Sequence, residues 1–160
     1  KTAITTINID KQLNQDNSTT NSITLNNYGQ EDISHITDQM KLNYIKLPFT
    51  GVQSMIEQVH FNNKKPENKN IAITNKKENM IKVYKDNRWR YKDKGEIIDE
   101  LIQINYGRLD DHYERGLDGK LSNVHNNRYK RFQHQFDNQE DKLINMIKKD
   151  IEMIILSSNL

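Results

Sequence analysis

The residues best suited to chemistry in this chain are cations, and they are concentrated in one segment. Eleven Lys and Arg lie between residues 64 and 94 against four acidic residues, a net charge of +7, whereas the whole chain carries only +2. Clustered cations neutralise phosphates and release the counterions condensed on nucleic acids. Arginine also matches a phosphate with two parallel N–H donors. The segment therefore favours a polyanionic ligand, with nucleic acid as the predicted partner.

The composition limits the weight that any single lysine carries. Asn, Ile and Lys make up 59 of the 160 residues, and all three have A/T-rich codons. A solvated basic face enriched by codon bias is therefore the alternative explanation. Arg128, Lys130 and Arg131 form a second, weaker basic patch. The candidate phosphate-binding residues are Lys64, Lys65, Lys76, Lys77, Lys82, Arg88, Arg90 and Lys92.

Signals for metal binding or catalysis are weak. The chain has no cysteine, and its five histidines form neither an HExxH pattern nor a pair at i, i+4 spacing. Asp110, Asp111, His112 and Glu114 crowd together, but surface acids explain them. No GxGxxG, GxSxG or phosphate-binding loop motif is present. We expect a non-enzymatic protein with no catalytic residues, no metal ligands and no cofactor.

The composition also bounds the fold. The chain is 34% hydrophobic and 29% charged, with a mean hydropathy of -0.96. No apolar run approaches the roughly 20 residues that cross a bilayer, so we expect no membrane partner. Because the sequence begins with Lys, we expect a fragment or a processed chain. The length is that of one domain, whose apolar residues must be concentrated in a few elements.

Residues 1–27 are rich in Thr, Asn, Gln and Ser. The alternating pieces 4–9 and 22–25 have strand propensity but too few apolar residues to form a core. They are either a connector or strands that pair with another copy of the chain.

Helical periodicity follows. Ile33, Ile36, Met40 and Tyr44 predict a helix over 31–44 that Pro48 ends. A second helix, capped by Thr50, is predicted to place Val52, Met55, Ile56 and Val59 on one buried stripe up to about residue 61.

The basic segment has strand periodicity instead. Ile71 and Ile73 predict a short strand, and the runs 80–84 and 88–91 predict a hairpin. A two-residue loop would mix apolar and charged residues on both faces. We therefore expect a three-residue loop, 85–87, that turns Trp89 and Tyr91 inward beside Ile81 and Val83. Lys82, Tyr84, Arg88, Arg90 and Lys92 would then form a basic outer face.

The remainder is predicted to be helical. Asp93 and Glu96 have capping-box spacing before a helix that ends near Tyr106 and Gly107. Further helices are expected over about 119–136 and 137–157. The last is apolar on more than one side, so it is either a core helix or a helix that pairs with its copy.

These elements predict an α+β protein in which N-terminal strands and two helices precede a winged-helix-like basic hairpin and a C-terminal bundle of about three helices. The expected boundaries are a connector over 1–27, an α+β core over 28–106 and a helical region over 107–160.

One short segment is similar to the first half of an HNH-type homing endonuclease. It comprises residues 59–62 around His60, followed by Pro66-Glu67-Asn68. The resemblance implies that His60 would help to activate water and that a later His or Asn would bind the metal, but no second histidine follows within the expected short helix. A degenerate nuclease is thus one alternative function.

A longer resemblance covers residues 28–105. The segments 28–36, 58–62, 66–71, 73–75, 83–89 and 96–102 are similar, in order and spacing, to an uncharacterised domain of giant DNA viruses of the mimivirus type. The resemblance implies that this chain is the C-terminal part of a protein with an N-terminal C2H2 zinc finger. It also implies a nucleic-acid-associated role in the host cytoplasm, the viral factory or the virion. No catalytic residue is carried over, and residues after Gly107 depart from that family.

The function we expect is sequence-independent binding of nucleic acid, DNA in particular, through the phosphate backbone by a homo-oligomer. The second alternative, beside the degenerate nuclease, is an oligomerisation domain whose basic face is incidental.

Overall fold

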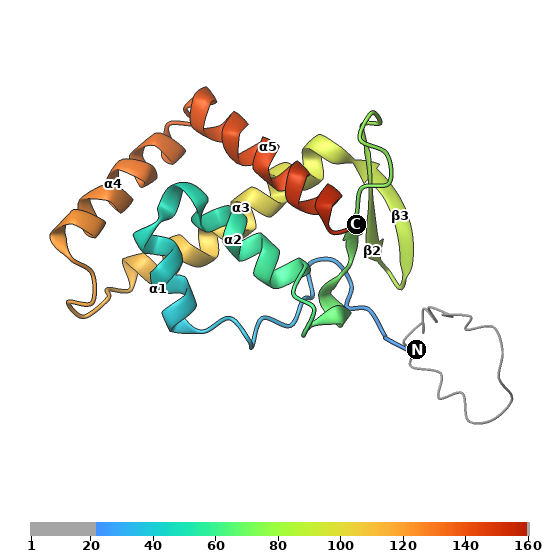
Figure 1. Cartoon of the computed structure of the whole chain (residues 1–160), viewed down its shortest axis with the longest axis horizontal. Coiled ribbons are helices and arrows are strands. Elements are labelled where there is room, and N and C mark those ends of the chain that lie inside the picture. The colour runs from blue at the N-terminus through green and yellow to red at the C-terminus, as the bar shows by residue number, and fades with distance from the viewer. Residues whose placement is uncertain (1–21, 160) are drawn as a thin grey trace, which may run out of the picture.

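The computed structural model describes residues 22–159 and shows an α+β protein. These residues form five α-helices, one 3₁₀-helix and a three-stranded antiparallel sheet in the order β1-β2-β3. The hairpin of β2 and β3 lies at one end of the helices and α4 at the other (Figure 1). The elements are α1 (Asp38–Lys46), α2 (Pro48–His60), η1 (Pro66–Asn68), β1 (Ile71–Ala72), β2 (Met80–Lys85), β3 (Arg88–Asp93), α3 (Lys94–Glu114), α4 (Asn123–Asp137) and α5 (Asp141–Ser157).

The N-terminal strand predictions are tested only in part. The piece 4–9 lies outside the described residues. The piece 22–25 is described and is not a strand, although Leu25 is buried. Asn26 N–H donates to Glu67 O at 2.7 Å, and Tyr28 N–H donates to Tyr84 O at 2.6 Å. The chain just before residue 28 is thus tied to the fold by its backbone.

The first two helices begin at other residues than predicted. Residues 31–37 do not extend α1, because Ser34 N–H donates to the Asp32 carboxylate at 2.9 Å and forms a local turn. Thr37 caps α1, with its hydroxyl accepting from Met40 N–H at 3.1 Å. Pro48 opens α2 instead of merely ending α1, which suits a residue that lacks an N–H donor. The predicted stripe of Val52, Met55, Ile56 and Val59 is confirmed as fully buried.

The hairpin turn differs from the prediction. Asp86 and Asn87 form a two-residue loop, and both have positive φ, 52° and 62°. Such a turn matches the right-handed twist of the flanking strands. Asn27 anchors it, because Asn27 Oδ1 accepts from Asn87 N–H at 2.9 Å and its Nδ2 donates to Asn87 Oδ1 at 3.2 Å. The three-residue loop over 85–87 is therefore wrong.

Because of this turn, each side chain of β3 lies on the face of the sheet opposite to the predicted one. Val83 lies opposite Arg90, and Tyr84 lies opposite Trp89. Paired residues share a face of the sheet, so Trp89 and Tyr91 lie on the outer face and not inside as predicted. The predicted basic outer face is wrong for the same reason, since Arg88, Arg90 and Lys92 share the face of Ile81 and Val83. Because β3 is an edge strand, these cationic side chains reach solvent beyond the helices.

The C-terminal helices also shift. The predicted cap of α3 is confirmed, because the Asp93 carboxylate accepts from Glu96 N–H at 2.9 Å. The predicted end near Gly107 is wrong, since α3 continues to Glu114 and buries Leu109. A glycine inside a helix lowers its stability but does not end it when the following turn is packed. The helix predicted from residue 137 begins at Asp141, after α4 has extended to Asp137.

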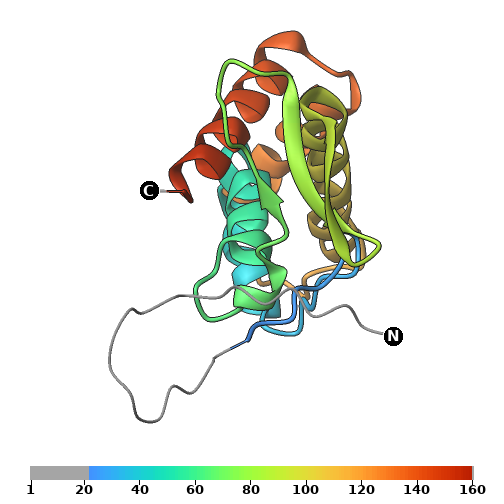
Figure 2. The same ribbon diagram turned by 90° about the vertical axis from the view of Figure 1, so that its right-hand side faces the viewer.

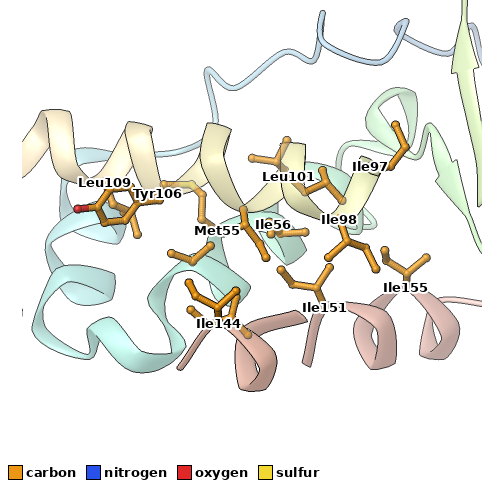
Figure 3. Packing of buried hydrophobic residues seen from close by; sticks show 14 of the residues in the cluster. Met55, Ile56, Ile97, Ile98, Leu101, Tyr106, Leu109, Ile144, Ile151 and Ile155 are labelled. Carbon is orange, nitrogen blue, oxygen red and sulfur yellow. The ribbon is translucent and has the colours of Figure 1, made fainter. Parts of the chain in front are cut away.

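The core lies between α2, α3 and α5. Figure 3 shows Met55 and Ile56 of α2, Leu101 of α3 and Ile151 of α5 directed toward one another, and these side chains are almost completely buried. This packing covers the apolar face of α5, which favours the first of the two predicted alternatives, a core helix, over a helix that pairs with its copy. Among residues 22–159, no helix combines the length and the apolar character needed to span a membrane.

Candidate nucleic-acid interface

The outer face of the sheet exposes aromatic side chains beside a lysine. Trp89 is 38% exposed and Tyr91 is 58% exposed. The Lys82 ammonium lies 5.4 Å from the centroid of the Tyr91 ring, within cation–π range. Trp89 contacts Tyr84 edge-on, with ring centroids 5.7 Å apart and planes at 70°. This face, defined by Lys82, Trp89 and Tyr91, is called the aromatic face below.

Three cations of the basic segment are engaged by carboxylates. Lys65 Nζ lies 3.1 Å from Asp32 and 3.7 Å from Glu67. The pKa of Asp32 lies well below its ordinary value. The backbone hydrogen bond from Ser34 is the largest cause, and the ion pair with Lys65 lowers this pKa further. The two remaining pairs are Arg90 with Asp86 and Lys94 with Glu152, each at 3.0 Å.

The other six predicted site residues are not neutralised in this way. Within residues 22–159, no carboxylate lies within 4.0 Å of the side-chain nitrogens of Lys64, Lys76, Lys77, Lys82, Arg88 and Lys92. They are divided between the loop after α2, the loop before β2 and the hairpin, and they are not gathered at one point. The loop with Lys76 and Lys77 precedes β2, at the end of the sheet opposite the turn at residues 86–87 (Figure 2). Of these six residues, only Lys82 has its side-chain nitrogen over an exposed aromatic ring among residues 22–159.

A groove of about 660 Å³ adjoins the aromatic face. Trp89 of β3 forms one wall, and the ends of α2 and α5 form others. Ala72 lines the groove and lies opposite Lys82 in the sheet, so the two surfaces are continuous. The lining residues are Glu57, Phe61, Asn63, Lys69, Ile71, Ala72, Trp89, Met153, Ile154, Ser157, Ser158 and Asn159.

Next to these surfaces lies a buried polar cluster around His60, which is 2% exposed. Asn70 Nδ2 donates to Glu31 Oε1 at 2.9 Å and to Asn26 O at 3.2 Å, so its Oδ1 accepts from His60 Nδ1 at 2.9 Å. His60 Nδ1 also lies 4.0 Å from Glu31 Oε1. Burial lowers the pKa of His60 below its ordinary value, although Glu31 opposes the shift.

The cluster extends to α3 through Tyr28. The Tyr28 hydroxyl donates to Glu100 at 3.1 Å, and its ring stacks on His60 with centroids 6.4 Å apart. Burial is the largest cause that raises the pKa of Tyr28 above its ordinary value. Burial also lowers the pKa of Arg108, whose charge faces Glu31. The cluster therefore joins the chain around residue 28 to α2 and α3.

The geometry around His60 does not support the alternative nuclease site. The ring is enclosed and hydrogen-bonded to Asn70, and Asn68 is likewise buried, its amide donating to Asp32 O at 2.7 Å. Among residues 22–159, no three His, Asp or Glu side chains form a group able to hold a metal ion.

The second basic patch is separate. Arg128 donates to Lys46 O at 3.3 Å, and the Arg131 guanidinium lies 5.6 Å from the centroid of the Phe49 ring. Both lie on α4, at the far end of the molecule from the sheet (Figure 1). The patch does not extend the hairpin surface.

The sequence prediction missed Trp89 and Tyr91 as surface residues. The signal that could have found them was the pair Asp86-Asn87, since both residue types tolerate the left-handed conformation that a two-residue hairpin turn requires. No local sequence pattern predicts the groove, because four separate elements and two connecting loops line it.

No protein-family model matches this chain, and no curated protein or solved structure is significantly similar to it.

Proposed function

We propose that this protein is a non-enzymatic nucleic-acid-binding module that uses the β2–β3 hairpin. The observation that carries the proposal is the juxtaposition of Lys82 with the exposed rings of Trp89 and Tyr91. Arg88 and Lys92 of β3 lie on the opposite face of the same hairpin, and no carboxylate among residues 22–159 lies within 4.0 Å of their side-chain nitrogens. The hairpin would bind nucleic acid as a winged-helix-like module does, and its cationic side chains would contact the phosphates.

The chemistry of the two residue types is complementary. Lys and Arg neutralise phosphates and release counterions, which makes binding strong at low salt and weak at high salt. Exposed aromatic rings stack on bases and need no particular sequence, because every base has a π-face. A face that carries both is suited to sequence-independent binding. Association of several copies would add avidity to each weak contact.

Charge reversal on β3 tests the proposal. Arg88→Glu with Lys92→Glu is preferred to any change at Arg90, whose guanidinium already pairs with Asp86. We expect the slope of log affinity against log salt to become shallower by about 1.4 to 1.8, because two phosphate contacts are lost. The measurement is fluorescence anisotropy of labelled oligonucleotides at two or more salt concentrations.

The matched control is Lys142→Glu with Lys149→Glu, which changes the net charge equally. Both lysines are exposed on α5, and no carboxylate among residues 22–159 pairs with them. If binding depends on the net charge alone, the two double variants will lose equal affinity. That result, or wild-type binding that does not respond to salt, would refute a hairpin interface.

A further inference from the structure

We infer that the groove beside the aromatic face receives an unpaired base, so that the ligand is single-stranded nucleic acid. The inference rests on the proposed function and specifies its substrate class. Trp89 connects the two surfaces, because its ring is partly exposed on the outer face of the sheet and also lines the groove. A strand that follows the hairpin therefore passes the opening of the groove.

The walls of the groove suit a flat, neutral group. Phe61, Ile154 and Trp89 supply apolar surface, and Met153 is 50% exposed there. A volume of about 660 Å³ lies within the range of small-molecule sites, roughly 300–1,000 Å³, and a single nucleotide is a ligand of that size class. Aromatic and thioether side chains pack well on the faces of bases.

Polar groups in the groove match the edges of a base. Asn159 Nδ2 donates to Ile73 O at 2.6 Å, and Asn63 Oδ1 accepts from Lys69 Nζ at 2.6 Å. The opposite atoms, Asn159 Oδ1 and Asn63 Nδ2, make no further hydrogen bond within residues 22–159. These two amides therefore offer one acceptor and one donor, the two kinds of partner that a base edge requires.

The charges place the phosphates outside the groove. Glu57 lines it, and α5 ends there with no basic residue in its last turn to offset the negative end of the helix dipole. Both features disfavour an anion in the interior. Lysines surround the groove instead: Lys69 lines it, Lys64 follows Asn63 in the chain, and Lys82 lies opposite Ala72.

This arrangement discriminates against duplexes. In a double helix the bases are stacked and paired, and only their edges are accessible. Insertion of a base into the groove requires a base outside the stack, which single strands supply without the cost of flipping. Duplexes would bind only through the phosphate contacts of the hairpin.

The experiment uses the full chain, whose only tryptophan is Trp89. Its fluorescence is titrated with a 12-nucleotide oligo(dT), a 12-nucleotide oligo(U), a 12-base-pair duplex and inorganic polyphosphate. We expect saturable quenching by oligo(dT), by oligo(U) or by both, and little change with the duplex or with polyphosphate.

Two variants separate the groove from the phosphate contacts. Trp89→Leu, measured with labelled oligo(dT), is expected to weaken binding by about 5- to 100-fold. Ser157→Tyr fills the groove from an exposed position in the last turn of α5 without altering Trp89. It is expected to weaken oligo(dT) binding and to leave duplex binding unchanged, whereas the control Asn145→Tyr, on an exposed part of α5, should affect neither.

Different results would overturn the groove inference and the hairpin proposal. If single strands and duplexes bind with equal, salt-dependent affinity, and Ser157→Tyr binds as the wild type does, the groove inference is overturned and the hairpin proposal stands. If no oligonucleotide binds at low salt, both are overturned. Circular dichroism of each variant verifies that the fold is retained, and Ser157→Tyr decides the question should Trp89→Leu not fold.

Discussion

At the scale of single residues, Asn70 connects three segments that are separate in the sequence. Its amide donates to Asn26 O and to Glu31, and it accepts from His60 Nδ1. Buried polar groups are stable only when they are hydrogen-bonded, and here each of these hydrogen bonds crosses between segments. Asn70 therefore positions the chain before α1 against the end of α2, which also forms part of the groove wall.

The His60 cluster predicts a dependence of stability on pH. Because burial lowers the pKa of His60 in the folded state, the unfolded chain binds more protons below the ordinary histidine pKa of 6.5. The free energy of unfolding should therefore fall as the pH drops below about 6.5, by at most about 1.4 kcal/mol per pH unit from this group. Urea unfolding at pH 7.5, 6.5 and 5.5 measures the fall.

The matched variant is His60→Gln, which removes the titrating group from the cluster. It should flatten the pH dependence over this range relative to the wild type, whatever its effect on overall stability. An equally steep dependence in His60→Gln would show that another group is responsible.

At the scale of elements, the approach of α1 to α2 depends on one glycine. A Cβ added at Gly51 would lie 2.5 Å from Tyr44 O, a backbone atom that cannot rotate away. By contrast, a Cβ at Gly107, in the middle of α3, would meet nothing within 4 Å apart from its own helix backbone. The same residue type thus has opposite roles in two helices.

Two alanine substitutions test this contrast. Gly51→Ala should destabilise the protein by about 1–3 kcal/mol, because the helices must move apart to relieve the overlap. Gly107→Ala should stabilise it by about 0.5–1 kcal/mol, because alanine has the higher helix propensity. Chemical denaturation of both variants measures the two changes. Destabilisation by Gly107→Ala would contradict the continuous helix α3 at this residue.

At the scale of the whole molecule, the fold begins before the first helix. Leu25 is buried, Asn26 N–H donates to Glu67 O in η1, and Asn27 holds the hairpin turn through Asn87. Residues 25–27 were predicted as the end of a connector, yet they contribute to the packing around the sheet. A truncation at residue 27 would therefore remove part of the fold.

Comparison of two truncated chains tests this contribution. The chain that lacks residues 1–27 should unfold at a temperature roughly 5–10 °C below that of the chain that lacks residues 1–21. The reason is that it loses the burial of Leu25, worth about 2 kcal/mol, and the anchor of the turn. Thermal unfolding followed by circular dichroism gives both midpoints, and equal midpoints would refute a structural role for residues 25–27.

Local patterns predicted those parts of the fold that local physics determines. The buried stripe of α2, the Asp93 cap of α3 and the apolar face of α5 follow from helical periodicity and capping, which depend on residues a few positions apart. The strand order of the hairpin was also predictable. The eight candidate cations were identified from their clustering in one segment, but the prediction that Arg88, Arg90 and Lys92 share an outer face with Lys82 was wrong.

Tertiary contacts decided the remainder. The register of β3 depends on a turn that Asn27 holds across 60 positions of sequence, and a change of one residue in the loop moves every side chain to the other face. The groove exists only where α2, β1, β3 and α5 converge. From the sequence alone one obtains an α+β protein with a basic hairpin. The exposure of Trp89 beside a groove follows only from the packing of those elements, because no local pattern encodes contacts between distant segments.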